Sequence, residues 1–257
     1  AVPTVSAIVE TGAIPVFCDV YESTYNINIE LIESLITKKT KAIVGVHLYG
    51  HPIKLTEIKK ICKKYNLIFV EDCAQSHGAK YLEKKVGSFG HVSAFSFYPT
   101  KILGGYGDGG MCLTNRKQYY DKLKKLRFYG MEKTYFSQID GVNSRLDEVQ
   151  AALLDYKLKK LNLYIKKRRA IAKRYNEELT NTNLVLPQEK KNYFHSYYLY
   201  VVRHENRDEI IKKLAKENIF VNISYPWPIH TMPPFKKYKK TNMKVTNKVA
   251  KEIFSLP

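Results

Sequence analysis

Three polar side chains lie at or just beyond the ends of predicted strands in this sequence. Asp72 follows the apolar run Leu67–Val70, and Ser96 lies near the end of Val92–Phe97. Lys101 comes shortly after that second run. Taken singly, such an aspartate can cap a helix, such a serine can satisfy a backbone group, and a loop lysine is commonly solvated. Ligands in open α/β sheets collect outside the carboxyl ends of the strands. The three residues together therefore suggest a single ligand site.

A carboxylate, a lysine and a hydroxyl are the groups that a pyridoxal-phosphate site requires. The carboxylate keeps the pyridine nitrogen protonated, so that the ring can accept electrons from a substrate carbanion. The lysine holds the cofactor as a Schiff base and then moves a proton once the substrate amine displaces it. Hydroxyls and backbone N–H groups hold the phosphate. Asp72, Lys101 and Ser96 match these roles by type and location, although composition and spacing alone leave other sites open.

The elements that would position these residues alternate between strands and helices. Short apolar runs typical of buried strands occupy Ala42–His47, Leu67–Val70 and Val92–Phe97. Apolar residues recur at helical spacing, with lysines between them, over Leu55–Tyr65. A glycine-rich turn follows at Gly104–Gly110, and Met111–Thr114 predicts one more strand. This alternation predicts an α/β fold with a mainly parallel sheet covered by helices.

A long helix is predicted next. Asn143-Ser144 opens it, with Ser144 as the N-cap and Asp147 as its partner in a capping box. An apolar stripe runs along the first turns, and helical character continues to about Leu179.

The composition changes after Thr180–Asn183, which predicts a second, smaller unit. A strand beginning at Ser196–Val202, a helix around Asp208–Lys216 and a strand at Ile219–Ile223 form a βαβ pattern. We therefore predict a large cofactor-binding domain over residues 1–180, ending in the linking helix, and a small C-terminal α/β domain over residues 181–257.

The bulk composition favours a soluble globular protein. Of 257 residues, 44% are hydrophobic and 12% aromatic. No stretch approaches the roughly 18 apolar residues of a membrane span, and no secretory leader opens the chain, so we expect no membrane partner. The four cysteines form no CxxC pair and have no histidines at ligand spacing. They predict reduced core cysteines in a cytoplasmic protein, and no metal site.

The net charge of +19 raises the alternative of nucleic-acid binding, because a basic face is the electrostatic signature of that function. The lysines are dispersed, however, and those of the predicted helix over Leu55–Tyr65 alternate with apolar residues as on a solvated face. No helix-turn-helix, RNP or finger pattern accompanies the charge. We expect no nucleic-acid partner, and instead an electrostatic attraction of an anionic small substrate.

Several longer segments resemble the DegT/StrS-type sugar aminotransferases. Glu71–Gly78 (EDCAQSHG) is similar to the family's EDxAQxHG segment. Phe95–Lys101 (FSFYPTK), followed by Gly107–Gly110 (GDGG), resembles the family's Schiff-base segment. Three further segments resemble family blocks in the family's order: Val46–Gly50, Gly141–Asp147 and Tyr225–His230. The resemblance covers nearly the whole chain.

This resemblance implies a fold-type-I enzyme that uses pyridoxal 5'-phosphate. Such enzymes move an amino group, usually from glutamate, onto a keto sugar attached to a nucleoside diphosphate. Carried over position by position, it makes Lys101 the Schiff-base lysine and Asp72 the partner of the pyridinium nitrogen. It also places Gln75 near the ring hydroxyl of the cofactor and Ser96 at its phosphate.

The resemblance also implies a homodimer with shared active sites. Asn143 would reach the cofactor phosphate of the neighbouring subunit. Tyr225 and His230 would lie near the substrate sugar. For His230, an ordinary loop histidine after a proline-rich turn remains an equal alternative.

Three departures from the family pattern bear on the site. The family has a segment before the equivalent of Ala1, with a phosphate loop and an aromatic residue near the cofactor, and a last helix after the equivalent of Pro257. We therefore expect this chain to be a fragment of a longer protein. Ile102 stands where many members have Asn, which we expect to alter local packing and to leave the chemistry unchanged.

Two motifs bear on which carbon of the sugar receives the amino group. Gly107–Gly110 and Arg127–Gly130 (RFYG) resemble members that aminate 3-keto sugars, which favours the 3-keto position of a deoxyhexose. A 4-keto sugar-nucleotide aminotransferase and a non-catalytic pyridoxal-phosphate-binding fragment are the alternatives. Lys101 argues against a dehydratase, because that branch of the family has histidine in place of the lysine.

Overall fold

The computed structural model describes residues 1–238 and 241–257, and the chain divides into two compact units. The sheet unit consists of Lys41–Arg168 and Asn192–Tyr198. The terminal unit consists of Ala1–Thr40, Arg169–Lys191 and Leu199–Pro257. These units follow compactness rather than chain order, and the predicted domains, residues 1–180 and 181–257, stay a prediction.

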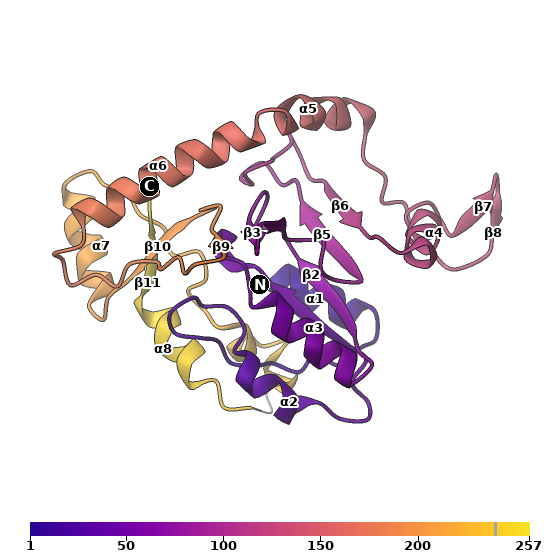
Figure 1. The fold of residues 1–257 in the computed structure, drawn as a ribbon, viewed down its shortest axis with the longest axis horizontal. Coiled ribbons are helices and arrows are strands. Elements are labelled where there is room, and N and C mark those ends of the chain that lie inside the picture. Colours follow the sequence, from indigo (N-terminus) through magenta and orange to yellow (C-terminus); the bar gives the residue numbers. More distant parts are fainter. Residues whose placement is uncertain (239–240) are drawn as a thin grey trace. The chain divides into compact units, whose positions relative to one another are not determined.

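The sheet unit is built on a four-stranded sheet of order β1-β2-β5-β6 (Figure 1). Its strands are β1 (Ala42–Val46), β2 (Ile68–Asp72), β5 (Val92–Ser96) and β6 (Gly110–Leu113). The first three are parallel, and β6 runs antiparallel to β5. The predicted mainly parallel α/β fold is therefore confirmed.

Helix α3 (Leu55–Lys64) shows how sequence pattern becomes packing in this unit. Its apolar residues Leu55 and Ile58 are fully buried, while the lysines later in the helix are exposed. The helix lies against β2 (Figure 1). Burying one apolar face against the sheet stabilises the helix by about 25 cal/mol per Å² removed from water.

The remaining elements of the sheet unit surround this core. They are η2 (Leu48–Gly50), β3 (Lys80–Tyr81), β4 (Lys84–Lys85), α4 (Lys117–Leu126), β7 (Met131–Lys133), β8 (Phe136–Ser137), α5 (Glu148–Leu158), the start of α6 (Leu161–Glu178) and β9 (Tyr193–Phe194).

The predicted long helix begins later than expected and is divided. Helix α5 starts at Glu148, its N-cap residue is Asp147, and no side-chain capping bond forms there. Ser144 is not the N-cap, because its backbone N–H donates to the carbonyl of Arg127. Pairing with the end of α4 thus holds the segment extended, and this tertiary contact overrides the local capping signal. The helix is interrupted at Lys159 and Lys160 before α6 begins.

The terminal unit contains short elements from both ends of the chain. They are α1 (Val2–Glu10), η1 (Ile29–Leu31), α2 (Ile32–Leu35), the rest of α6, β10 (Tyr200–Arg203), α7 (Arg207–Lys216), η3 (Ile229–Thr231), η4 (Lys236–Tyr238), α8 (Lys244–Glu252) and β11 (Ile253–Leu256).

The partner of β10 is β11, which pairs with it antiparallel. The predicted strand at Ile219–Ile223 is wrong, because only Asn222 of this segment forms a bridge, to Ser255 of β11. Strand β11, the last strand of the chain, pairs with β10 where the predicted βαβ unit would have placed residues 219–223.

Asp19 fixes the start of α8 from a distant part of the sequence. Its carboxylate accepts hydrogen bonds from the backbone N–H groups of Val245 and Thr246 at 2.9 and 2.8 Å, and from the Thr246 hydroxyl at 2.6 Å. An anionic side chain at a helix N-terminus satisfies free N–H groups and interacts favourably with the helix dipole.

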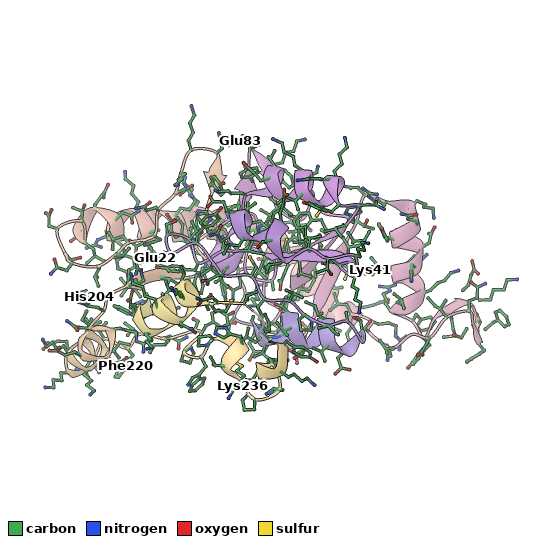
Figure 2. All side chains as sticks on the ribbon, turned by 90° about the horizontal axis from the view of Figure 1, so that it is seen from below. Glu22, Lys41, Glu83, His204, Phe220 and Lys236 are labelled. Carbon is green, nitrogen blue, oxygen red and sulfur yellow. The ribbon has the colours of Figure 1, made fainter. Side chains whose placement is uncertain are left out.

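Charged side chains extend outward from the ribbon, among them Lys41, Glu83 and Lys236 (Figure 2). Within residues 1–238 and 241–257, no helix combines the length and apolar character needed to cross a bilayer.

Candidate active site

Asp72 and Ser96 lie at the carboxyl ends of neighbouring parallel strands. In the β2–β5 register Asp72 is opposite Ala94, so Ser96 follows on the same strand end. The Asp72 carboxylate accepts a hydrogen bond from Ala74 N at 3.0 Å, and the Ser96 hydroxyl oxygen accepts one from Tyr98 N at 3.3 Å. Both residues are half-buried. The predicted sheet edge therefore carries both groups.

Lys101 lies in the turn that follows β5. Its backbone N–H donates to the carbonyl of Tyr98 at 2.9 Å. The next residue, Ile102, is buried in the apolar cluster that includes Leu154 and Ile165. The departure from the family pattern at this position thus serves packing, and it anchors the lysine backbone to the core.

Tyr198 contacts Lys101 from a segment far away in the sequence. The Lys101 ammonium lies 4.7 Å from the centroid of the Tyr198 ring, and the Tyr198 hydroxyl lies 3.3 Å from that of Thr100. Arg168 donates to the carbonyl oxygens of Tyr197 and Tyr198 at 3.2 and 3.0 Å, which holds the segment in place. Sequence reasoning missed Tyr198, because its spacing in SYYLYVV is that of an ordinary strand.

Gly50 allows this segment to approach η2. Its φ is +97°, a backbone angle that residues with a side chain rarely adopt. A Cβ added there would lie 3.0 Å from Tyr198 N. The backbone N–H of Ser196 donates to the Gly50 carbonyl at 3.0 Å. The segment that carries Tyr198 is therefore docked by backbone contacts that only glycine permits.

Gln75 and His77 lie on the loop after β2. The Gln75 side-chain oxygen accepts a hydrogen bond from Tyr49 N at 2.8 Å. His77 is buried, with its ring 5.4 Å from that of Phe95 and 6.1 Å from that of Phe97. Burial first, and the positive charge of Lys101 second, lower the pKa of His77 to about 4. A neutral imidazole therefore stands beside the lysine near pH 7, a role that the sequence motif alone did not indicate.

The glycine-rich turn after Lys101 is held by helix α5. The backbone N–H of Tyr106 donates to the Gln150 side-chain oxygen at 3.0 Å, and the Lys157 ammonium donates to the carbonyl of Gly104. A Cβ at Gly104 would collide with the carbonyl of Pro99. Glycine is required there because two backbone segments meet in contact.

Asn143 lies in the sheet unit, in the segment before α5. It is exposed, and its side-chain oxygen accepts a hydrogen bond from Arg145 Nε at 3.1 Å. Its backbone forms a bridge with Phe128.

Tyr225 and His230 belong to the terminal unit, so their position relative to Lys101 stays a prediction. Tyr225 is half-buried in the loop before η3. His230 is fully buried, with Nε2 2.9 Å from the side-chain oxygen of Asn247.

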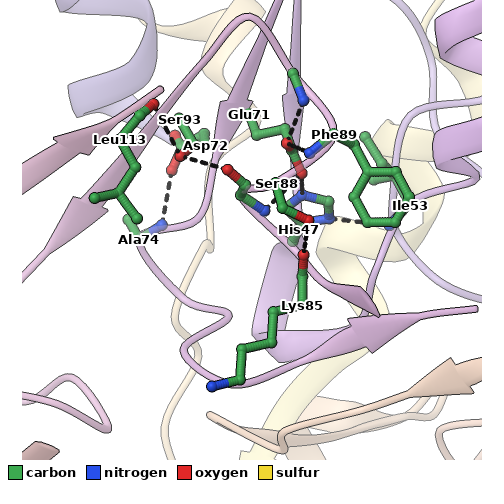
Figure 3. A network of polar contacts seen from close by, with 12 residues as sticks. His47, Ile53, Glu71, Asp72, Ala74, Lys85, Ser88, Phe89, Ser93 and Leu113 are labelled. Atoms are coloured by element: carbon green, nitrogen blue, oxygen red, sulfur yellow. Dashed lines mark hydrogen bonds and ion pairs between the residues drawn. The ribbon is translucent and has the colours of Figure 1, made fainter. Parts of the chain in front are cut away.

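A second cluster with ligand-forming atoms lies on the other side of β2. The ligand atoms of His47, Glu71 and Cys73 all lie within 4.8 Å of one another, and all three residues are buried. Figure 3 shows that His47 and Glu71 are joined in a hydrogen-bond network. Because backbone donors occupy the Glu71 carboxylate, this cluster is explained by hydrogen bonding among the chain's own groups.

The mainly parallel α/β sheet fits the fold of the fold-type-I pyridoxal-phosphate-dependent aminotransferases. The family model for the DegT/DnrJ/EryC1/StrS aminotransferase family matches residues 2–257, and the chain belongs to this family. The predicted family and enzyme class are thereby confirmed.

Relatives and solved structures agree with this membership. The chain is 47% identical to a dTDP-3-amino-3,4,6-trideoxy-alpha-D-glucose transaminase of Micromonospora megalomicea subsp. nigra, over 100% of this chain and 71% of the relative. It is 42% identical to a dTDP-3-amino-3,6-dideoxy-alpha-D-galactopyranose transaminase of Aneurinibacillus thermoaerophilus, over 100% and 70%. A solved DegT DnrJ EryC1 StrS aminotransferase from Brucella abortus is similar with a TM-score of 0.94 and 36% identity, covering 98% of this chain and 70% of that one.

A further solved structure bears on the cofactor. The ntdA protein of Bacillus subtilis was solved with bound cofactor PMP. It is similar to this chain with a TM-score of 0.91 and 28% identity, over 99% of this chain and 60% of that one.

Proposed function

We propose that this protein transfers an amino group from glutamate to a keto sugar linked to a nucleoside diphosphate, at the 3-keto position of a deoxyhexose. The observation that carries the proposal is the common sheet edge of Asp72 and Ser96, with Lys101 in the turn beyond it. The names of the two relatives, both transaminases of dTDP-linked 3-amino sugars, support the substrate class and the sugar position. Such a reaction belongs to amino-sugar and glycan biosynthesis.

The donor set of the site fits pyridoxal 5'-phosphate. Asp72 offers a carboxylate for the pyridine nitrogen, and Gln75 offers an amide for the ring hydroxyl. Ser96 offers a hydroxyl for the phosphate, and Lys101 offers the amine that attaches the cofactor. The Gln75 side chain is already oriented by Tyr49 N, which reduces the entropy lost on binding. The fit rests on the chemistry of groups that the fold brings to one edge.

When bound, the cofactor supplies an electron sink for the negative charge that develops at the carbon bearing the amine. The Asp72 carboxylate holds the proton on the ring nitrogen by charge and hydrogen bonding. The Lys101 Nζ moves the proton at the reacting carbon, as a general base and acid. His77 stays neutral near pH 7, so no second buried positive charge opposes the ammonium of Lys101.

We propose that the working unit is a homodimer in which Asn143 reaches the cofactor phosphate of the partner copy. Exposed apolar side chains near Asn143 support this assignment. Val142 is 65% exposed, and Phe128 and Tyr129, whose backbones pair with Asn143 and Val142, are partly exposed. Exposed apolar side chains that gather in one region of a surface commonly mark an interface.

The substrate assignment includes Tyr225 and His230 at the sugar, and the net charge of +19 as an attraction for the nucleotide phosphates. The four cysteines are free, which supports a reducing, cytoplasmic location. Amination at the 4-keto position, and cofactor binding without turnover, are the two competing outcomes.

The test is a substrate panel. The purified protein is mixed with pyridoxal phosphate, glutamate and dTDP- or UDP-linked 3-keto and 4-keto sugars, and the product is identified by mass and NMR. We expect a visible cofactor band, and an amino group at carbon three. A product aminated at carbon four would correct the sugar position. A cofactor band that glutamate does not change would favour the non-catalytic alternative, and no cofactor band at all would contradict the proposal.

A further inference from the structure

Glu71 is a fully buried carboxylate enclosed by donors of the chain itself (Figure 3). One oxygen lies 3.1 Å from His47 Nε2 and accepts from Gly87 N at 2.8 Å. The other accepts from Phe89 N at 2.8 Å and from Gly90 N at 2.5 Å. Four hydrogen bonds thus converge on a side chain directly adjacent to Asp72.

The hydrogen bonds define the charges in this network. His47 Nδ1 accepts a hydrogen bond from Ile53 N at 3.1 Å, so the ring proton must be on Nε2, which then donates to Glu71. Burial by itself raises the pKa of Glu71, but the hydrogen bonds from His47, Gly87 and Gly90 outweigh burial and leave it below its usual value. Glu71 is therefore a charged acceptor that requires its donors.

The network connects the carboxyl ends of β1 and β2 with the loop that leads into β5. His47 directly follows β1, Glu71 is within β2, and residues 87–90 precede β5. The backbone N–H of His47 also donates to the carbonyl of Asp72 at 3.1 Å. His47 therefore holds the end of β2 twice, through the Asp72 backbone and through the Glu71 side chain.

Adjacent residues of a strand point to opposite faces, so Glu71 and Asp72 face opposite ways. Locking Glu71 on one face limits how β2 can rotate or shift, and this constrains the direction of the Asp72 side chain on the other. Catalytic groups need placement within about 0.5 Å of their productive geometry, and supporting hydrogen bonds commonly provide it.

We infer that Glu71 and His47 are positioning residues that orient the Asp72 carboxylate toward the cofactor ring nitrogen. This inference rests on the proposed function, which assigns that role to Asp72. A network that served only folding would affect stability without a specific effect on the cofactor. A positioning network must also affect how the bound cofactor titrates and reacts.

Two conservative variants of His47 separate these roles. His47→Asn retains an acceptor where Nδ1 lies, and so keeps the bond from Ile53, but loses the donor to Glu71. His47→Gln places an amide donor where Nε2 lies, and so keeps the bond to Glu71 but loses the one from Ile53. A purely folding role predicts that both variants, once folded, keep the wild-type kcat and cofactor titration, whatever stability each loses. They are compared as holoenzymes in glutamate turnover and in a pH titration of the visible cofactor band.

We expect His47→Asn to lower kcat about tenfold or more with a smaller change in KM for glutamate, since small misplacements of a reacting group are costly. We expect its cofactor titration to shift, and His47→Gln to stay close to wild type in both measurements. Equal effects of the two variants, or a wild-type titration and kcat in His47→Asn, would overturn the inference while leaving the proposed function in place. A wild-type protein without a cofactor band would overturn the proposed function, and the inference with it.

Discussion

Glu71 and Asp72 are neighbouring acids on one strand with different surroundings. Glu71 is fully buried and receives four hydrogen bonds from the chain, three of them from backbone N–H groups. Asp72 is half-buried at the carboxyl edge of the sheet, where Ala74 N contacts one of its oxygens. Under the proposed function, the enclosed carboxylate holds the end of β2 in place, and the carboxylate at the sheet edge binds the cofactor.

The largest expected effect concerns the ligand side of this comparison. Lys101→Ala removes the amine that attaches the cofactor and moves the proton, so we expect the visible cofactor band to disappear. Transamination should fall by at least about 10²–10⁴-fold, the usual contribution of general acid–base catalysis. Lys60→Ala, an exposed lysine on α3, is the control and should retain both. Retention of the band in Lys101→Ala would remove Lys101 from the site.

Exchanging each acid for its amide tests the comparison directly. Glu71→Gln puts an NH₂ group against backbone donors and breaks a buried charge network, so we expect it to cost about 3–5 kcal/mol of the free energy of unfolding. Asp72→Asn keeps an oxygen for Ala74 N and should cost about 1 kcal/mol or less. In turnover the order should reverse for the folded proteins, with Asp72→Asn nearly inactive. Urea unfolding gives the first result and glutamate kinetics the second; a larger stability loss in Asp72→Asn would contradict the comparison.

Acid pH should destabilise the protein through its enclosed carboxylates. For Asp19, burial by itself raises the pKa, but hydrogen bonds from Thr246, Val20 and Val245 outweigh burial and lower the pKa below its usual value. The hydrogen bonds to Glu71 lower the pKa of that carboxyl in the same way. A folded pKa below the unfolded one contributes stability that is present above the unfolded pKa of about 4 and is lost as pH falls through the folded value. The urea midpoint of unfolding should therefore fall below about pH 4. This fall should be smaller in Asp19→Asn than in Glu205→Gln, which replaces an exposed carboxylate and serves as the control. Identical acid profiles for the two variants would exclude Asp19 as a source of the decline.

The smallest expected effect is at Tyr198, on the ligand side. Tyr198→Leu removes the ring that faces the Lys101 ammonium, and a contact of this kind is worth about 0.5–1 kcal/mol. We expect a change of a few-fold in kcat/KM for glutamate. Tyr198→Phe keeps the ring and loses only the contact with Thr100, so it should stay nearer wild type. If Tyr198→Phe and Tyr198→Leu behave alike, the hydroxyl rather than the ring is the important group.

Local pattern predicted much of the sheet unit. The strand runs and the α3 periodicity correspond to β1, β2, β5 and α3 within a few residues, because alternation and helical spacing report burial directly. Prediction failed at Ser144 and at Ile219–Ile223. The backbone of Ser144 pairs with Arg127, and β10 pairs with β11 instead of with residues 219–223. Both partners are distant in the sequence.

The sequence by itself determined the family, the enzyme class and the candidate roles of Asp72, Gln75, Ser96 and Lys101, because these lie in contiguous motifs beside strands. Only the tertiary structure brought Tyr198 to Lys101, gave His77 a buried position beside it, and enclosed Glu71 with donors from residues 47 and 87–90. The physical reason is that the energy of a buried charge or ring depends on groups that folding brings together from distant parts of the chain. No local pattern in the sequence records which of those groups will meet.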